Sequence, residues 1–525
     1  VTPSTYKEIQ SKLFNYVFTT DMDCIQRYKQ ALKHDRVYVL PFGFQPKLHN
    51  PVTEFNRINK VCFAGAYYKK YHERNRNMAD ILLGLQDEVD YDIYDRNFLE
   101  DNPEYTFPNE FTKSIVGTLN FDEINLAYKG YEIGLNLNTI KHSPTMFARR
   151  VFELLASNTL VFSNFSRGMK LLFGELVFMS DSGQQILQDY TVLSKNELAR
   201  IKLFGIRNVF SQHTYEHRLH YIISKFSLQK PPLVSRRVLV ISMIDSKEEG
   251  HSVISAFENQ EYQDCSLIIL KTNDFILTSK NSKIEILEIR ELDAHFFEEL
   301  MKDAEFLSVL CPISSYGPYF IQDLVHASMY IDRRAITKHV GFQDDESLIT
   351  PEKLIYSKTE SVNSCAMLIP KSMIMNKPVL PNLNTWKNRT EISFPGFVID
   401  NDNFVHKDVS KDKWQFEKDE IDSGLSYSKL VQFSEQIMAD EVSSEGQYFP
   451  SAQIYQQICD SNREKVSVDF SSGKTIIDST LDQGEFTYLY WHEFMKPSDI
   501  GIEDNIAELY LDASPGLRMM LAVIF

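Results

Sequence analysis

The chain has 525 residues, enough for about three domains, and its 43% hydrophobic and 24% charged residues are typical of a folded protein. Its formal net charge of −17 excludes general electrostatic binding to nucleic acid and argues against broad binding to anionic membranes. Six scattered cysteines without a CxxC pair favour reduced thiols in a cytoplasmic protein over a disulfide framework or a zinc site. We see neither a signal peptide nor an apolar run that would span a bilayer, which leaves only peripheral membrane association open.

Residues 1–50 predict a helix, a strand (NYVFTTD), a second helix (DCIQRYKQALKH) and a second strand (RVYVLPFGF). The loop that follows contains Pro46 and Pro51 and is typical of a hinge between domains. The first helix has no strand before it, and the last residues, LRMMLAVIF, end within a predicted strand. We therefore expect the chain to be a fragment of a longer protein.

Residues 51–228 alternate between strands and helices. The predicted strands are VCFAGA, YDIYD, SIVGTL, IGLNLN, TLVFSN and ELVFMS. This alternation predicts an α/β domain with an open, doubly wound parallel sheet of the Rossmann type. Ligands bind at the carboxyl ends of the strands of such sheets. The candidates that follow strands are Gly65, Asp95, Arg96 and Asn138.

The segment SPTMFARRVFELLASN predicts a helix capped by the Ser143 side chain, beginning at Pro144 and ending at Asn158 in the left-handed conformation. Its apolar residues recur on one helical face, which is the face expected to pack on the core. Arg149 and Glu153 are four residues apart and fall off that face. One interpretation of this pair is a solvated ion pair on the helix surface.

The other interpretation is an anion site. Arg149 and Arg150 are close to the expected helix start, where a cation is unfavourable unless an anion is also present. A diphosphate bound at this N-terminus would remove that cost. We favour this second interpretation.

The stretch SLQKPPLVSRR (227–237) marks the next predicted boundary. A second α/β domain, beginning with the strand VLVISMI, is expected over residues 235–445. Short alternating runs over residues 460–525 predict the start of a β-sandwich or jelly roll. His213 and His217 have the spacing of a metal pair on a helix, but no third ligand is evident, so we interpret them as part of a polar helix face.

Residues 15–225 resemble the C-terminal half of a GT-B glycosyltransferase, in particular the CgeB-like group found in bacterial spore-surface and cell-wall polysaccharide loci. The resemblance is carried by FTTDMDCIQRYK, LPFGFQPKLHNP, CFAGAYY, YDIYDRN, IVGTLNFDEINLAYKGYEIGLNLN, SPTMFARRVFELLASNTLVFSN and HTYEHRL. It implies transfer of a sugar from a nucleotide-diphospho-sugar to a glycan or a polyol-phosphate (teichoic-acid-type) acceptor, with no metal or other cofactor. The acceptor side and any general base would lie in the N-terminal domain, of which only residues 1–50 are expected here.

In related GT-B enzymes a motif of Glu, seven residues and Glu marks the donor site. The resemblance gives Glu153 the role of the second glutamate, which binds the ribose hydroxyls, while the first falls at Thr145, a neutral hydroxyl. It implies that Arg149 or Arg150 holds the diphosphate by charge-assisted hydrogen bonds. The remaining residues expected to line the donor pocket are Gly65, Asp95, Arg96, Asn138 and Ser143.

Residues 238–345 contain the phrases VLVISMI, ENQEYQDCSLIILKTND and YGPYFIQDLVHASMYIDRRAITK. In these phrases the segment resembles the GT-A fold of family-2-like glycosyltransferases. The place of its Asp-x-Asp cluster reads SVLCPISS, without a carboxylate, and Lys271 and Thr272 replace the aspartates expected after SLIIL. Because magnesium and manganese bind through carboxylates, the resemblance implies an inactive GT-A-like domain kept as a scaffold or glycan-binding module. A different alignment would place the acidic residues elsewhere, for example at Asp344 and Asp345.

The whole chain also admits an alternative function. It could be a non-enzymatic glycan-binding or assembly protein built from decayed glycosyltransferase domains. An intact acceptor cleft in the missing N-terminal half would favour the enzyme.

Overall fold

The computed structural model describes residues 11–12, 14–53, 55–85, 88–226, 234–292, 294–338, 355–375, 391–406, 421–437, 466–469, 474–477 and 509–512. The chain divides into two compact units, one formed by Val1–Leu233 with Ile421–Phe525 and the other by Val234–Glu420. The domain boundary expected near residue 445 lies outside the described residues, while residues 421–437 pack within the first unit. No helix in the described part of the chain combines the length and the apolar character needed to cross a bilayer.

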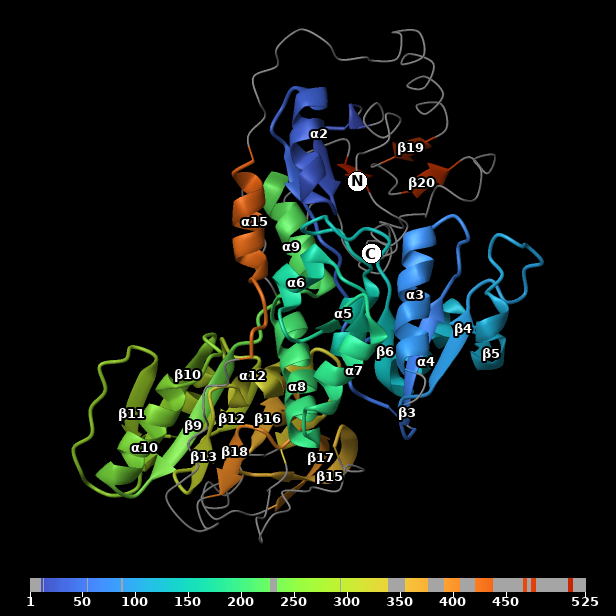
Figure 1. Cartoon of the computed structure of the whole chain (residues 1–525). Coiled ribbons are helices and arrows are strands. Elements are labelled where there is room, and N and C mark those ends of the chain that lie inside the picture. Colours follow the sequence, from blue (N-terminus) through green and yellow to red (C-terminus); the bar gives the residue numbers. More distant parts are fainter. Residues whose placement is uncertain are drawn as a thin grey trace. The chain divides into compact units, whose positions relative to one another are not determined.

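The first unit contains a parallel sheet of six strands in the order β5-β4-β3-β6-β7-β8, of which Figure 1 labels β3 to β6. These strands are β3 (Ile58–Gly65), β4 (Tyr91–Asp95), β5 (Ile115–Gly117), β6 (Tyr131–Asn136), β7 (Leu160–Ser163) and β8 (Phe178–Met179). Each lies within or over one of the predicted runs, so the predicted Rossmann-like α/β fold is confirmed. The strand order reverses between β3 and β6, which is the switch point where such sheets bind ligands.

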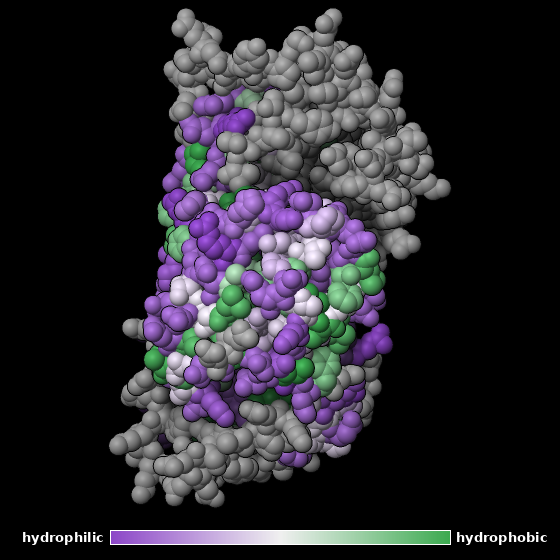
Figure 2. Space-filling model, turned by 45° about the vertical axis from the view of Figure 1, so that its right-hand side comes forward, coloured by the Kyte–Doolittle hydropathy of each residue, from purple (hydrophilic) through white to green (hydrophobic). Residues whose placement is uncertain are grey.

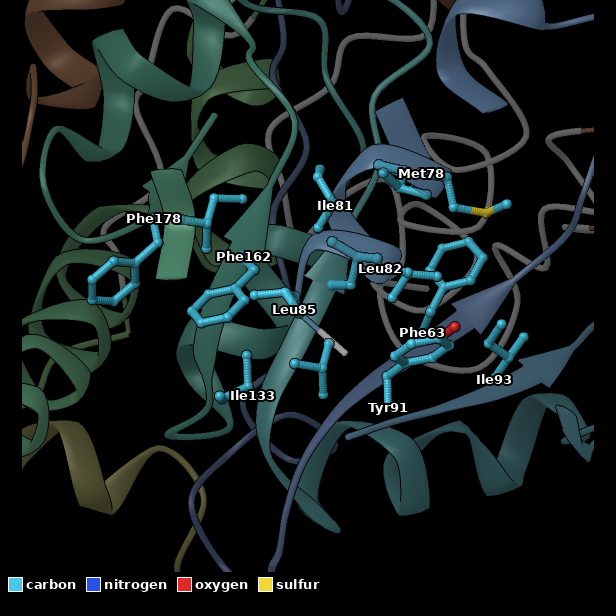
Figure 3. Close-up of a cluster of buried hydrophobic side chains, with 14 of the residues drawn as sticks. Phe63, Met78, Ile81, Leu82, Leu85, Tyr91, Ile93, Ile133, Phe162 and Phe178 are labelled. Atoms are coloured by element: carbon cyan, nitrogen blue, oxygen red, sulfur yellow. The ribbon is translucent and has the colours of Figure 1, made fainter. Parts of the chain in front are cut away.

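Helices lie between the strands of this sheet and after its last strand, β8. They are α3 (His72–Leu85), α4 (Ile124–Lys129), α5 (Arg150–Ala156), α6 (Arg167–Phe173), α7 (Gly183–Thr191), α8 (Lys195–Gln212) and α9 (Tyr215–Phe226), with 3-10 turns at Asn109–Ser114 and Phe121–Glu123. Met78, Ile81, Leu82 and Leu85 recur at helical spacing along α3 and are fully buried. They pack against Phe63, Ile93, Ile133 and Phe162 of the strands (Figure 3). This packing holds the N-terminus of α3 beside the carboxyl end of β3.

A smaller sheet in the same unit is formed by β1 (Tyr16–Thr19), β2 (Val37–Val39) and β21 (Leu509–Asp512), all parallel. Its apolar core includes Val17, Ile25 and Tyr28, the latter two from α2 (Ile25–Leu32), which follows a 3-10 turn at Met22–Cys24. Helix α15 (Tyr427–Glu435) also belongs to this unit. Strands β19 (Val466–Asp469) and β20 (Lys474–Ile477) form an antiparallel pair. Most residues of the predicted β-sandwich lie outside the described ones.

The second unit is built on an eight-stranded mixed sheet in the order β11-β10-β9-β12-β16-β14-β17-β15. Its strands are β9 (Val238–Ile244), β10 (Cys265–Lys271), β11 (Ile284–Glu288), β12 (Phe306–Val309), β14 (Ala335–Lys338), β15 (Ser357–Asn363), β16 (Met367–Pro370) and β17 (Glu391–Ile399). Strands β9 to β12 are parallel, β16 is antiparallel to both neighbours, and β14 and β17 are parallel. A separate pair joins β13 (Ser314–Tyr316) to β18 (Phe404–His406), and the helices are α10 (Lys247–Glu258), α11 (Ala294–Leu300), α12 (Phe320–Ser328) and α13 (Lys371–Met375), with a 3-10 turn at Ile289–Glu291.

The surface seen in Figure 2 is mostly hydrophilic, with hydrophobic side chains in smaller groups between the polar ones. The charged groups that matter for the site are therefore better identified by burial and pairing than by surface composition.

Candidate functional site

Helix α5 begins at Arg150 and not at Pro144, so the predicted helix start was wrong by six positions. The Ser143 hydroxyl does accept backbone hydrogen bonds, from Thr145 N at 3.3 Å and Met146 N at 2.9 Å, but these close a turn. The predicted end of the helix is confirmed, because Asn158 has a φ of 59°.

Ser143 and Thr145 bind a distant part of the chain, and this explains the late helix start. Ser143 Oγ donates to Asp21 Oδ1 at 2.6 Å. Thr145 Oγ1 donates to the carbonyl of Thr20 and accepts from the N–H of Met22, both at 2.8 Å. Both hydroxyls thus join the loop after β6 to the segment after β1.

Asn138 also makes hydrogen bonds with other residues of the protein. It is buried, its Oδ1 accepts from Ala148 N at 2.8 Å, and its own N–H donates to Asn164 Oδ1 at 2.7 Å. Its Nδ2 donates to Ser163 Oγ at 3.1 Å. These bonds fix the loop between β6 and α5, which places the two arginines that follow.

Glu153 is 3% exposed, so the alternative of a solvated ion pair with Arg149 is wrong. Arg149 Nε lies 2.8 Å from Glu153 Oε1, His49 Nε2 is 3.9 Å from the same oxygen, and the Tyr128 hydroxyl bonds to the carboxylate. Burial raises the pKa of Glu153, but Arg149 and His49 outweigh it and the net pKa is lowered. The carboxylate is ionised and engaged by protein groups.

Arg150 hydrogen-bonds the Tyr128 side chain and also reaches the end of β3. Its Nη2 donates to the carbonyl of Ala64 at 2.5 Å, and its guanidinium lies 5.4 Å from the centre of the Phe63 ring. A Cβ on Gly65 would lie 2.6 Å from Phe63 Cζ and 3.2 Å from Arg150 Nη2. Glycine at this position therefore permits the approach of Arg150 to the strand end.

Arg74, in the first turn of α3, reaches the same strand end from the other side and was not among the sequence candidates. It is 8% exposed, and its Nη2 donates to the carbonyl of Ala66 at 3.2 Å. Burial and the nearby Arg150 lower the pKa of Arg74 to about 10. The guanidinium is still charged at pH 7, so the lowered pKa reflects the cost of keeping it charged in a buried place and beside another cation. A cation in the first turn of a helix that follows a glycine-ended strand was the available sequence signal.

Two buried donor atoms at this strand end have no hydrogen-bond partner in the described part of the chain: Arg74 Nη1 and Arg150 Nε. Buried donors without partners are rare and costly. The N-terminus of α3 adds further positive potential. An anion with several acceptor oxygens, such as a diphosphate, would satisfy both guanidinium groups at the switch point of the sheet.

Asp95 is the last residue of the neighbouring strand, β4, and Arg96 follows it. Asp95 pairs in register with Gly65, is 6% exposed, and accepts from Asn97 N at 3.0 Å. Burial raises its pKa. Arg96 is exposed, and its N–H donates to the carbonyl of Gly65 at 3.0 Å. The structure thus brings Gly65, Asp95, Arg96 and Arg150 to one edge, whereas Ser143, Thr145, Asn138 and Glu153 contact other protein groups.

The interpretation of the two histidines as part of a polar helix face was wrong, because His213 follows the end of α8 and His217 lies in α9. His213 is fully buried, and its Nδ1 is 2.7 Å from Arg218 Nη2, while His217 Nδ1 is 2.6 Å from Thr214 Oγ1. Burial and Arg218 hold the pKa of His213 well below 6.5. Across the described residues, no group of three or more His, Cys, Asp or Glu side chains could hold a metal ion.

Several solved structures are similar to part of this chain. Sucrose-phosphate synthase from Thermosynechococcus elongatus is 14% identical over 39% of this chain and 56% of its own, with a TM-score of 0.29. A glycosyltransferase from Rickettsia africae is 15% identical over 42% and 64%, with a TM-score of 0.32. S. aureus TarM, solved with fondaparinux, alpha-GlcNAc-glycerol and UDP, is 11% identical over 42% and 45%, with a TM-score of 0.30. This chain therefore spans about half to two thirds of the length of these proteins.

No curated protein matches the chain. A family model described as glycosyl transferase-like matches residues 93–224, which run from β4 through most of α9. The matched region holds four of the six strands of the parallel sheet and the end of β4, together with Asp95 and Arg150. Residues 93–224 are therefore similar to a glycosyl transferase-like family.

Proposed function

We propose that the first unit binds a nucleotide-diphospho-sugar and is the donor half of a GT-B glycosyltransferase. The observation that carries the proposal is the pair Arg74 and Arg150, whose buried donors lack partners at the carboxyl end of β3. The glycosyl transferase-like family match supports a sugar donor over other anionic ligands. The acceptor that we propose, from the CgeB-like resemblance, is a bacterial cell-surface or spore polysaccharide or a teichoic-acid-type polymer.

In this reaction the bond between the anomeric carbon and the diphosphate oxygen breaks, and the electron pair leaves with the nucleoside diphosphate. The acceptor hydroxyl oxygen forms the new bond to carbon and releases its proton. Negative charge therefore grows on the leaving diphosphate. Arg74, Arg150 and the N-terminus of α3 are placed to stabilise that charge.

The remaining residues of the expected site act indirectly in this proposal. Glu153 holds Arg149 at the start of α5, so the diphosphate contact falls to Arg150. Ser143, Thr145 and Asn138 fix the loop that leads to α5. We propose no catalytic base, because the acceptor side is expected on the N-terminal domain.

For the second unit we propose a GT-A-like scaffold without sugar transfer of its own. Strand β12 ends at Val309, and the segment that follows, up to Ser315, holds no carboxylate. A metal bound by carboxylates at this place would have no ligand there. The same observation favours the alternative function, in which the whole chain binds glycan without catalysis.

Isothermal titration calorimetry of the full chain with pyrophosphate, UDP, GDP, CDP and ADP tests the donor site. We expect at least one nucleotide to bind, and Arg74→Gln and Arg150→Gln each to weaken it by about tenfold or more. Arg76→Gln is the matched control, because Arg76 is exposed on the same helix. Binding unchanged in both variants would overturn the site, and binding without release of nucleoside diphosphate from a sugar donor would favour the non-enzymatic alternative.

A further inference from the structure

Cys311 and Cys365 form a pair of neighbouring thiols in the second unit, although they are far apart in the sequence. Their side chains are 2% and 0% exposed, and the two thiols hydrogen-bond each other. The sequence contains no CxxC motif, so spacing along the chain does not reveal this cysteine pair. The fold therefore creates a possible site of thiol chemistry that the scattered cysteines do not suggest.

The backbone holds the two cysteines opposite each other. Strands β12 and β16 are antiparallel, and their register, continued past the strand ends, leads from Cys311 to Cys365. The Tyr316 hydroxyl joins the two backbones, because it accepts from Cys311 N and donates to the Cys365 carbonyl, both at 2.8 Å. Facing residues of antiparallel strands have Cα atoms about 4.5–5.5 Å apart, within the range of roughly 4.4–6.8 Å that a disulfide spans. This arrangement of the backbone suits a disulfide.

The cysteine pair lies beside the switch point of the second sheet. The direction in which parallel strands are added reverses between β9 and β12. Cys311 follows the carboxyl end of β12, and Cys365 precedes β16. In open α/β sheets, the loops at such a point border the ligand site. A bond between the two sulfur atoms would tie the loop after β12 to the turn before β16.

We propose that Cys311 and Cys365 are a redox pair, which hydrogen peroxide converts to a disulfide that fixes the loop after β12. The thiolate of one cysteine attacks a peroxide oxygen, the O–O bond breaks, and sulfenic acid and water are formed. The sulfur of the other cysteine then attacks the sulfenic sulfur, the S–S bond forms and a second water leaves. The two sulfur atoms together lose two electrons, and the peroxide takes up these electrons and the two thiol protons.

Burial controls the rate of the first step. It raises the pKa of the Cys311 thiol well above its ordinary value, and the neighbouring Cys365 raises it further. The thiolate, which is the reactive form, is therefore a small fraction of the population at pH 7. We expect slow oxidation that accelerates as the pH rises, by up to about tenfold for each pH unit below the pKa.

Mass spectrometry of the full chain after incubation with hydrogen peroxide tests the cysteine pair. The remaining thiols are blocked with N-ethylmaleimide in denaturant before digestion. We expect a peptide linked through Cys311 and Cys365 in most chains, which dithiothreitol separates again. Because the disulfide restricts the unfolded chain and the loop, hydrogen exchange in peptides of β12 and β16 should become slower by about tenfold or more.

Cys265→Ser is the matched control, because Cys265 is buried on β10 of the same sheet and its thiol donates to the Tyr262 carbonyl. This variant should keep both the link and the slower exchange, whereas Cys311→Ser and Cys365→Ser should lose both. The proposal is overturned if folded wild type forms no link between the two cysteines, or forms it only after urea has unfolded the chain. A link that leaves hydrogen exchange unchanged would also overturn it, since the loop would then not be fixed. None of these outcomes depends on nucleotide binding by the first unit.

Discussion

The carboxyl ends of the two sheets both hold buried cations, but the cations are satisfied differently. In the first unit, Arg74 and Arg150 each keep a buried donor atom without a partner. In the second unit, Lys338 is fully buried at the end of β14, and its ammonium contacts Asp323 Oδ2 at 2.9 Å, Asp400 Oδ1 at 2.6 Å and the Asp402 carbonyl at 2.7 Å.

An ammonium has three protons to donate, and these three oxygens take all of them. A guanidinium has five N–H protons to donate, so Arg74 and Arg150 retain donors after binding the backbone of β3 and of the loop that follows it. A buried cation at a strand end therefore indicates a ligand site only where some of its N–H donors have no acceptor within the protein. Of the two sheet edges, the first is the one that can bind an anion, and the second is closed by internal ion pairs.

The largest expected effect is on the second edge. Lys338→Met should lower the free energy of unfolding of the second unit by about 3–5 kcal/mol, because it leaves buried Asp323 and half-buried Asp400 without their cation. Hydrogen exchange of peptides covering β14 and β17 would measure the loss. Lys358→Met, at an exposed position on β15, should change it by less than about 0.5 kcal/mol. A change of under about 1 kcal/mol for Lys338→Met would show that the ammonium is dispensable.

The next effect concerns the engaged carboxylate of the first unit. Glu153→Gln should lower the free energy of unfolding by about 1.5–3 kcal/mol at pH 7, because it removes the charge from a buried hydrogen bond to Arg149. The folded pKa of Glu153 lies below its ordinary value of 4.5, so its contribution is complete above that pH and is lost as the pH falls through the folded pKa.

Urea unfolding of wild type and of Glu153→Gln, from pH 7 down to the lowest pH at which wild type folds, should show that the difference between their free energies of unfolding decreases. A difference in the free energy of unfolding that is constant over this range would mean that Glu153 is not held ionised by Arg149. Arg76→Gln is again the neutral comparison, since its side chain is exposed.

The elements of the first unit could be predicted because each follows from a local pattern. The alternation of short apolar strands with helices set the parallel sheet, and the spacing of Met78, Ile81, Leu82 and Leu85 along α3 repeats every helical turn. Asn158 ends α5 in the left-handed conformation, as its residue type favours. These features depend on neighbours within a few residues.

The site was less predictable because it depends on distant contacts. Thr145 reads as a residue in a helix start, yet its hydroxyl binds Met22, which is 123 positions away. Glu153 reads as a surface charge, yet His49 and Tyr128 cover it. Arg74 stands among polar residues in ERNRN and becomes buried only when α3 docks beside β3. Local residue patterns in one sequence do not indicate such contacts between residues that are far apart along the chain.

A smaller effect on stability is expected for Arg74→Gln without ligand, within about 1 kcal/mol of wild type. The lost bond to the Ala66 carbonyl is offset by relief of repulsion with Arg150. Pyrophosphate at 100 times its Kd should then stabilise wild type by about 2.7 kcal/mol and the variant by clearly less. Thermal melts with and without pyrophosphate would show this, and a loss as large as that of Lys338→Met without ligand would make Arg74 a structural cation.

The smallest effect separates unpaired donors from general positive charge. Lys141 lies close to the first turn of α3, where its Nζ is 2.5 Å from Asp181 Oδ2 and 3.2 Å from Glu73 Oε1. The charge of Lys141 is already balanced by these two carboxylates. Lys141→Met leaves both carboxylates without a cation, and their negative charges, which solvent and salt partly screen, should weaken pyrophosphate binding by less than about threefold. Lys202→Met removes a similar pair with Glu132 at the amino end of β6 and should have no effect. A tenfold loss in Lys141→Met, as large as that expected for Arg74→Gln, would mean that the first edge attracts anions through its summed potential and not through the unpaired donors of Arg74 and Arg150.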